Sequence, residues 1–353
     1  MPDLAKMKHM VFPRNVLVGN GAIDQLGDTV ADLEPSGRGM VVVDAMTRKL
    51  VGDRVVASLH DAGFETAIYE SPGPTMQSVN ALVKQGKAAG AGFYIGAGGG
   101  SVIDVAKLAA FEHGPGFISV PTSASHDGIC SGRASIKEST GSTSKEAKPP
   151  MAIVADTEVI SKAPYRMLVA GCADVISNKT AVLDWKLANR LKAEEYSTFA
   201  AVLAQSGADL VLDHIDSIKP GLPEAAWITV KSLIVSGVSM AVAGSSRPAS
   251  GAEHLFSHQL DRIAPGKAMH GEQVGVGTML MMNLHGGDWK EIRDALTTLG
   301  APVTAKQLGI PKAKIVEALT TCHTLRPERY TILGESGLNK EAALQLGKEC
   351  GVF

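Results

Sequence analysis

The stretch GFYIGAGGGSVIDVAKLAAF, residues 92–111, contains the pattern that decides the fold. The β-rich run FYI leads into a glycine cluster from Gly96 to Gly100, and a helical pattern follows from Ser101. Glycines let backbone amides approach a phosphate group closely, and a helix N-terminus adds a partial positive charge. The stretch therefore predicts a strand, a diphosphate-binding turn and a helix. Because Ser101 replaces the last glycine of a GxGxxG pattern, a tight turn capped by Ser101 is the alternative.

Short β-rich runs alternate with helical patterns on both sides of this stretch. The further predicted strands are residues 15–19, 40–45, 64–70, 116–121 and 151–156. Such alternation indicates parallel strands joined by crossover helices. The segment KESTGSTSKEAKPP, residues 137–150, is polar and ends in two prolines, which fits a hairpin or a loop.

The pattern changes after about Pro164. Long helical patterns, such as residues 173–190 and 194–215, follow one another, and strand patterns cease. A chain of 353 residues also exceeds what one hydrophobic core usually organises. We predict an α/β domain with a Rossmann-like parallel sheet over residues 1–160, and an all-α domain over residues 161–353.

The composition excludes some classes of partner. Charged residues make up 20% of the chain, hydrophobic residues make up 45%, and the net charge is −2. These values are typical of a soluble globular protein and provide no broad basic surface, so we expect no nucleic-acid partner. The most apolar run, residues 227–244, is interrupted by Lys231 and several serines. We predict a buried helix there, and we do not expect the protein to be embedded in a membrane.

The cysteines and the N-terminus both favour the cytoplasm. The cysteines lie far apart without a CxxC spacing, which indicates reduced thiols and no disulfide framework. The first ten residues, MPDLAKMKHM, lack the apolar core of a signal peptide. The cysteines are Cys130, Cys172, Cys322 and Cys350.

A second candidate site lies in VPTSASHDGICSGRASI, residues 120–136. A predicted strand ends there in a proline, and Thr122, Ser123 and Ser125 then offer short hydroxyl groups. Loops at the ends of parallel strands form ligand sites in open α/β sheets. The alternative is a surface loop that happens to be rich in serine.

Three histidines lie within GAEHLFSHQLDRIAPGKAMHGEQVG, residues 251–275. His254 and His258 are four residues apart in a predicted helix and so face the same side, and His270 follows the turn APGK. Asp174 is the best-placed carboxylate upstream, and we expect it at the start of a helix. Zinc accepts imidazole nitrogen and carboxylate oxygen, and Asp174, His254 and His270 supply the three ligands of a catalytic site. The alternatives are ordinary core or surface histidines and a helix-capping aspartate.

Five segments together resemble a known family: GAGGGSVIDVAKLAA, PTSASHDG, ADVISNKTA, GAEHLFSHQLD and AMHGEQVGVGTM. In this order and separation they are similar to the sn-glycerol-1-phosphate dehydrogenase family, and the similarity covers nearly the whole chain. That family belongs to the iron-containing alcohol dehydrogenase and dehydroquinate synthase-like superfamily. The resemblance implies a dehydroquinate synthase-like fold. It also implies a zinc-dependent reduction of dihydroxyacetone phosphate by NADH or NADPH, which yields sn-glycerol 1-phosphate for archaeal membrane lipids. We expect a homo-oligomer.

The resemblance also implies roles for particular residues. The cofactor diphosphate would contact Gly98, Gly99, Gly100, Ser101 and Val102. The nicotinamide end would contact Thr122, Ser123, Ala124, Ser125 and Ser131. The substrate would contact Asp127, Asp174 and His258. Zinc would bind Asp174, His254 and His270.

Other features concern the metal, the proton donor and the choice of cofactor. Iron-dependent members of the superfamily often have a histidine four residues after the ligand aspartate, and Asn178 stands there, which favours zinc. His258, or a water held by it and Asp127, is the expected proton donor. Asp44 could bond to the adenosine ribose of NAD, and Arg48 could pair with the 2′-phosphate of NADP, so we expect use of both cofactors. The alternative for both is a polar strand end and a solvated helix start.

Other interpretations of the function remain open from the sequence. The substrate phosphate needs a cation, and the candidates are Lys267, Arg326 and Arg329, but ordinary surface charge is the stronger interpretation of each. A glycerol dehydrogenase or another metal-dependent polyol dehydrogenase is the nearest alternative function. A dehydroquinate synthase-like lyase and a catalytically silent nucleotide-binding protein are alternatives of other classes.

Overall fold

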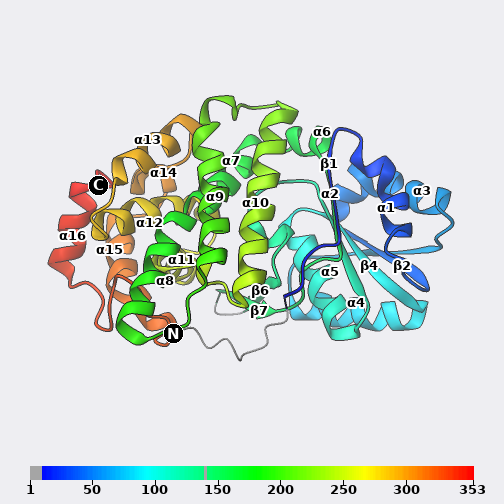
Figure 1. Ribbon diagram of the computed structural model, residues 1–353, viewed down its shortest axis with the longest axis horizontal. Helices are drawn as coiled ribbons and strands as arrows, with labels where there is room; N and C mark the ends of the chain where they lie inside the picture. Colours follow the sequence, from blue (N-terminus) through cyan, green and yellow to red (C-terminus); the bar gives the residue numbers. More distant parts are fainter. Residues whose placement is uncertain (1–9, 139–140) are drawn as a thin grey trace.

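A computed structural model describes residues 10–138 and 141–353, in which a sheet with flanking helices is followed by a purely helical half (Figure 1). The predicted α/β and all-α fold class is therefore confirmed. The N-terminal segment MPDLAKMKHM lies outside the described residues except for Met10.

Six parallel strands form the sheet, in the order β1-β8-β5-β4-β2-β3. All six strands predicted from the sequence are present, with starts that differ by two residues at most. The strands are β1 (Asn15–Gly19), β2 (Arg38–Val43), β3 (Thr66–Glu70), β4 (Ala91–Gly98), β5 (Gly116–Pro121) and β8 (Ala152–Asp156).

Helices cover both faces of this sheet, which explains why its central strands are apolar throughout. Val41 and Val43 of β2 pack with the helices of one face, and the alternate residues Met40 and Val42 pack with those of the other face. The helices of the first face are α1 (Leu26–Ala31) and α3 (Asp53–Asp61), and those of the second are α4 (Met76–Ala89) and α5 (Gly100–His113). A short helix, α2 (Ala45–Thr47), follows β2.

The segment predicted as a hairpin or a loop forms a two-stranded antiparallel hairpin, apart from residues 139–140, which lie outside the described residues. Its strands are β6 (Arg133–Glu138) and β7 (Gly141–Glu146). The hairpin contacts α5 on one side and α11 (Ala252–Ile263) on the other, so it lies between the two halves (Figure 1).

Only helices follow β8 in the described part of the chain. The remaining helices are α6 (Thr157–Ser161), α7 (Tyr165–Ile176), α8 (Asn178–Lys192), α9 (Thr198–Asp213), α10 (Pro223–Ala243), α12 (His270–Leu284), α13 (Trp289–Leu299), α14 (Ala305–Leu308), α15 (Lys312–Thr321) and α16 (Lys340–Glu349). By length and composition α10 could cross a membrane, but 72% of its apolar window is buried inside the fold. The prediction of a buried helix in this region is confirmed.

Close approaches of backbone at glycines join the two halves. A Cβ atom on Gly171 of α7 would lie 2.0 Å from the carbonyl oxygen of Ala124, in the loop after β5. A Cβ atom on Gly271 of α12 would lie 2.0 Å from the carbonyl oxygen of Ala170, also in α7. Larger side chains would separate these elements, so glycine allows the loop after β5, α7 and the start of α12 to meet at one place.

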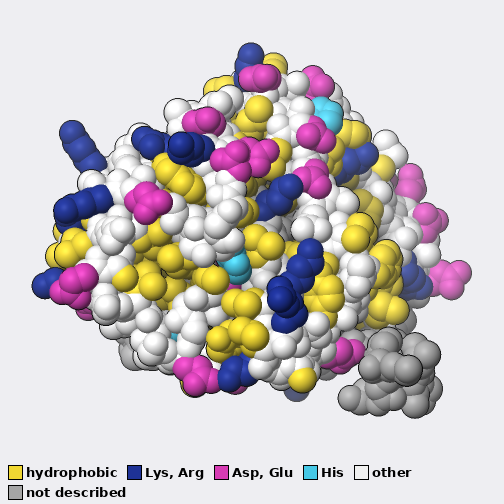
Figure 2. Space-filling view, turned by 60° about the vertical axis from the view of Figure 1, so that its left-hand side comes forward, with side chains coloured by type: hydrophobic (Ala, Val, Ile, Leu, Met, Phe, Trp, Pro, Cys, Tyr) yellow, Lys and Arg dark blue, Asp and Glu magenta, His cyan; other side chains and the backbone are white. Residues whose placement is uncertain are grey.

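Acidic and basic side chains are interspersed on the face drawn in Figure 2.

All four cysteine thiols are free and buried.

Candidate active site

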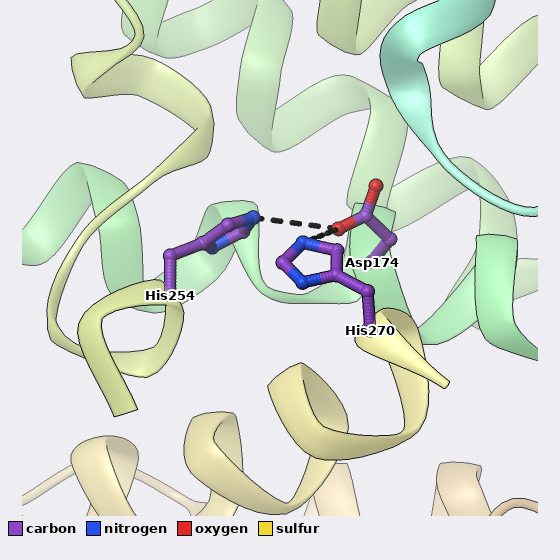
Figure 3. Close-up of side chains that lie close together, drawn as sticks. All are labelled: Asp174, His254 and His270. Carbon is purple, nitrogen blue, oxygen red and sulfur yellow. Dashed lines mark ion pairs between the residues drawn. The ribbon is translucent and has the colours of Figure 1, made fainter. Parts of the chain in front are cut away.

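Three side chains from separate helices converge where the two halves meet. Asp174 lies in the last turn of α7, His254 in α11, and His270 is the first residue of α12. The Nε2 atoms of His254 and His270 lie 3.4 Å and 3.7 Å from Oδ1 of Asp174 (Figure 3). The expectation that Asp174 begins a helix is wrong, because α7 already begins at Tyr165. Asp174 is therefore not a helix cap.

The donor set at this point fits a divalent cation. Oδ1 of Asp174 is buried and has no hydrogen-bond partner among the described residues. Oδ2 accepts the backbone N–H of Asp127 at 3.1 Å. Buried polar atoms are normally paired, and an unpaired carboxylate oxygen facing two imidazoles is typical of a metal ligand. Asp174, His254 and His270 each offer one ligand atom within 4.8 Å of the others.

Each histidine has its other ring nitrogen fixed by a partner. Oε1 of Glu253 lies 3.0 Å from Nδ1 of His254, and a carboxylate can only accept, so Nδ1 carries the proton. Ser257 donates to Gln273, so its hydroxyl oxygen accepts from Nδ1 of His270 at 2.9 Å. With a cation bound, both rings would therefore present an unprotonated Nε2 to it, which is how partners of this kind orient metal-binding histidines.

Without a metal ion, the pKa values of the three side chains indicate that His254 is positively charged, Asp174 is ionised and His270 is neutral near pH 7. Burial would lower the pKa of His254, but the neighbouring carboxylates of Asp174 and Glu253 raise that pKa to about 10. Burial would raise the pKa of Asp174, but the neighbouring imidazoles of His254 and His270 lower it to about 2. Burial and the charge on His254 lower the pKa of His270 to about 4. The positive charge of the metal-free site therefore lies on His254. A metal ion would displace the proton that gives His254 this charge.

The three groups line a cavity of about 270 Å³ that also contains Asp127 and His258. The ring centre of His258 lies 5.6 Å from that of His270. Burial, reinforced by the two neighbouring histidines and two arginines, holds the pKa of His258 well below its usual range, so this imidazole is neutral. Burial and the nearby charge of Asp174 raise the pKa of Asp127 to about 6.

The glycine turn forms the other end of this cavity. The connections after β2 and β4 run in opposite directions along the sheet, which leaves a crevice outside the carboxyl ends of these strands. A Cβ atom on Gly98 would lie 2.7 Å from Cβ of Val102, and one on Gly100 would lie 2.0 Å from Nε2 of His126. A side chain at Gly98 would clash with Val102, and one at Gly100 would require the His126 ring to move, so the turn packs closely against its neighbours. Gly100 and Ser101, at the N-terminus of α5, line the cavity.

The loop after β5 lies directly beside this turn. Gly98 and Pro121 are partners in the sheet, and Thr122 donates its backbone N–H to the carbonyl of Gly98 at 3.0 Å. The structure thus brings the glycine turn and the residues predicted for the nicotinamide end together. Of these predicted residues, Gly100, Ser101 and Ser131 line the cavity. Thr122, Ser123 and Ala124 are buried, and Ser125 is half-buried.

Asp44 and Arg48 already have partners within their own loop. Oδ1 of Asp44 accepts from the backbone N–H groups of Met46 and Thr47 and so caps α2. Arg48 forms an ion pair of 2.5 Å with Asp53. Asp44 thus has the structural role of a helix cap, at the carboxyl end of β2 where the crevice opens.

Comparisons with known proteins show which family the chain belongs to. The profile of the iron-containing alcohol dehydrogenase family matches residues 17–164. The NAD(P)+ glycerol-1-phosphate dehydrogenase of Methanococcoides burtonii is 53% identical over 336 residues, which cover 95% of this chain and 94% of that protein. The enzyme of the same name from Methanothermobacter thermautotrophicus is 52% identical over 337 residues and 96% of both chains. The chain belongs to the glycerol-1-phosphate dehydrogenase family. It is an oxidoreductase.

Solved structures agree with this fold. The glycerol dehydrogenase of Schizosaccharomyces pombe superposes with a TM-score of 0.81 at 22% identity, over 98% of this chain and 90% of that one. The probable glycerol dehydrogenase of Sinorhizobium meliloti superposes with a TM-score of 0.79 at 20% identity, over 98% and 100%. At these identities the comparison concerns the fold alone.

In this member of the glycerol-1-phosphate dehydrogenase family, Asn178 serves helix packing. Its side chain is buried and donates to the carbonyl of Ala204 and to Oγ of Ser236, which joins α8 to α9 and α10. The amide is therefore committed to these helices, and Asn178 offers no fourth group to Asp174, His254 and His270.

Two residues that shape the site, His126 and Lys107, were not predicted from the sequence. His126 lies in the cavity between the glycine turn and the three converging side chains, and it accepts from the N–H of Gly128. Lys107 is buried beside Asp104 and donates to the carbonyls of Gly128 and Arg133, so it ties α5 to the loop after β5. His126 lies inside the motif PTSASHDG and could have been noticed there, whereas Lys107 has the pattern of an ordinary helix residue in the sequence.

Proposed function

We propose that this oxidoreductase reduces dihydroxyacetone phosphate to sn-glycerol 1-phosphate with NADH or NADPH, and that it requires zinc. The observation that carries the proposal is the unpaired, buried Oδ1 of Asp174, which faces the Nε2 atoms of His254 and His270. Relatives at 50–53% identity named NAD(P)+ glycerol-1-phosphate dehydrogenase support the choice of substrate and cofactor.

The residues around the crevice would orient the cofactor. Backbone N–H groups from Gly98 to Val102, at the start of α5, would bind its diphosphate, because a helix N-terminus carries partial positive charge and Gly100 and Ser101 line the cavity. The predicted contacts from Thr122 to Ser125 and at Ser131 would hold the nicotinamide end beside the histidines. The bound nicotinamide supplies the hydride.

The converging side chains would hold the metal beside the substrate ketone. Asp174, His254 and His270 fit zinc because a carboxylate and two imidazoles are ligands it prefers, and because Asn178 is committed elsewhere. When bound, the ion supplies a positive charge that polarises a ketone and stabilises the developing alkoxide. Glu253 and Ser257 keep the two Nε2 atoms aimed at that position.

Asp127 and His258 would deliver the proton. Because the pKa of His258 lies well below its usual range, a neutral imidazole cannot act as an imidazolium acid near pH 7. Asp127, with a pKa raised to about 6, holds a proton more readily than an ordinary carboxyl group. We therefore favour transfer of a proton from the Asp127 carboxyl group to the substrate oxygen through a water held between Asp127 and His258, which leaves Asp127 ionised.

The proposal extends to the setting of the enzyme. It includes use of both NAD(H) and NADP(H), a cytoplasmic location, a homo-oligomer and a role in making the glycerophosphate backbone of archaeal membrane lipids. It also includes the division into a cofactor domain, residues 1–160, and a metal- and substrate-binding domain, residues 161–353. The free, buried thiols agree with a reducing compartment.

The decisive experiment is NADPH and NADH oxidation with dihydroxyacetone phosphate, followed by chiral analysis of the product. We expect sn-glycerol 1-phosphate, and loss of activity on zinc removal with recovery on zinc addition. A higher kcat/KM for dihydroxyacetone or glycerol would point to a polyol dehydrogenase. Predominant sn-glycerol 3-phosphate would contradict the proposal. Absence of net NADPH and NADH consumption would favour the lyase or the silent binding protein.

A further inference from the structure

Two cationic side chains that line the cavity, Arg326 and Lys137, have charged donors without a partner among the described residues. Lys137 is exposed, whereas Arg326 is partly buried. Arg326 lines the same cavity as Asp174, His254 and His258. Its guanidinium forms no hydrogen bond or ion pair with any residue that the structure describes, although it is only half-exposed. A planar guanidinium with five N–H donors inside a cavity is suited to bind an anion with two parallel hydrogen bonds.

The other arginines near Arg326 are tied to the protein. Arg329 donates to the carbonyl of Ser250 at 2.5 Å and to Oγ of Ser246 at 2.9 Å. Arg133, in β6, donates to Oγ and to the carbonyl of Ser144. Both are therefore held in place by the fold, and Arg326 remains free to contact a ligand.

These arginines repel one another. Burial and then the charge of Arg326 lower the pKa of Arg133, which Glu146 partly offsets. Burial and then the charges of Arg247 and Arg326 lower the pKa of Arg329 to about 10, despite the opposing effect of Glu194 and Glu253. Glu194 is itself paired with Arg247. The group of Arg133, Arg326 and Arg329 thus has excess positive charge, which an anion between them would relieve.

This excess charge lies beside the reacting end of the cavity. Arg326 and Arg329 both act electrostatically on His258, which is one helical turn from His254 in α11. Ser250, just before that helix, lines the cavity as well. Lys267, the remaining candidate from the sequence, is exposed and does not line the cavity. An anionic group on a ketone held at Asp174 would therefore share this cavity with Arg326.

We propose that Arg326 binds the phosphate group of the substrate and thereby selects a phosphorylated ketone over the free polyol or ketone. This inference rests on the proposed function and deepens it. A phosphate dianion accepts two parallel N–H bonds from a guanidinium, and Arg133 and Arg329 add long-range attraction. A substrate without the phosphate would leave Arg326 with an uncompensated charge in the cavity, so it would gain nothing from this arginine.

The test compares Arg326→Gln with wild type, both loaded with zinc, on dihydroxyacetone phosphate and on dihydroxyacetone. Because the substitution removes a charged pair of hydrogen bonds to the phosphate, it should lower kcat/KM for dihydroxyacetone phosphate about 10- to 100-fold. The rate with dihydroxyacetone should stay within about twofold. Arg326→Lys keeps the positive charge but loses the two parallel N–H donors. It should therefore give an intermediate kcat/KM for dihydroxyacetone phosphate. Arg262→Gln, an exposed arginine of α11 that does not line the cavity, is the matched control and should behave as wild type.

A binding measurement separates this inference from the proposed function. Calorimetric titration of the zinc-loaded enzyme with inorganic phosphate should show binding in wild type and Arg262→Gln, and weaker binding by about tenfold in Arg326→Gln. The KM for NADPH should not change. Equal losses with both substrates, or a raised KM for NADPH with unchanged phosphate binding, would overturn the role of Arg326. If wild type fails to reduce dihydroxyacetone phosphate, the proposed function fails, while phosphate binding still decides whether Arg326 forms an anion site.

Discussion

Glu253 and His254 are neighbours in the sequence, and their side chains also meet: Oε1 of the buried carboxylate lies 3.0 Å from Nδ1 of the imidazole. Oε1 also accepts the backbone N–H of Gly251, and Oε2 accepts the hydroxyl of Thr180. The carboxylate is therefore fixed on three sides. His270 is held by neutral partners instead, so the two imidazoles have different basicity.

Replacing Glu253 should weaken metal binding. We expect Glu253→Gln to raise the Kd for zinc about 10- to 100-fold, because the charged acceptor that orients His254 is lost. Competition with a chromogenic zinc chelator measures this value directly. Glu224→Gln, at an exposed site at the start of α10, is the control. An unchanged zinc Kd in Glu253→Gln would show that the carboxylate serves the fold alone.

Metal-free protein should become less stable as pH rises above neutral. The pKa of His254 is raised to about 10 in the fold, against about 6.5 in an unfolded chain, so its stabilising charge is fully present below about pH 6.5 and is lost as pH approaches about 10. Thermal unfolding of chelator-treated protein at about pH 6.5, 8 and 10 should show this decline. His254→Ala should remove most of it. Stability that increases over this range would contradict the assignment.

The glycine turn should tolerate no side chain at Gly98. In Gly98→Ala the new Cβ would lie 2.7 Å from Val102, so the start of α5 must shift, at a cost of about 1–3 kcal/mol. We expect the Kd for NADH to rise about tenfold in a fluorescence titration, with zinc content unchanged. Gly19→Ala, where no heavy atom lies within 4 Å of the new Cβ, is the control. Equal NADH affinity in the two variants would argue against diphosphate binding here.

Asp127 should matter for turnover and for its pH dependence. We expect Asp127→Asn to lower kcat about 10²- to 10⁴-fold, as for other proton-transfer groups, without changing zinc content. Because the pKa of Asp127 is raised to about 6, the proton it supplies is lost as pH rises through neutral, and the rate of reduction should fall accordingly. The residual rate of Asp127→Asn should not show this decrease with rising pH. Asp213→Asn, exposed at the end of α9, should retain both the rate and the profile of wild type.

The buried pair of Lys107 and Asp104 should be important for stability. Lys107→Met removes one partner of an ion pair of 3.1 Å and leaves Asp104 buried and uncompensated, at an expected cost of about 3–5 kcal/mol in the free energy of unfolding. Urea unfolding measures this loss. Lys84→Met, on the exposed side of α4, should cost less than about 0.5 kcal/mol. A similar small loss in Lys107→Met would mean that the pair contributes little.

The fold could be predicted well from the sequence because its signals are local. The change from a β-rich run to glycines and then to a helical pattern, as at residues 92–111, depends on residues that are close along the chain. The same holds for the later helices and for the buried run that became α10. Residue types alone were also sufficient to propose Asp174, His254 and His270 as a set.

Only the tertiary structure decided how these side chains meet. Local pattern placed Asp174 at the start of a helix, whereas α7 begins at Tyr165 and Asp174 lies in its last turn. The close approach of Gly271 to Ala170 brings α12, which begins at His270, against α7. The partners of the imidazoles, the place of His126 beside Gly100 and the free guanidinium of Arg326 likewise depend on distant segments. The sequence by itself determined which elements form and which chemical groups are available. Their convergence was decided by close packing between elements far apart in the chain, since the distances within a site depend on such packing and local propensity does not encode them.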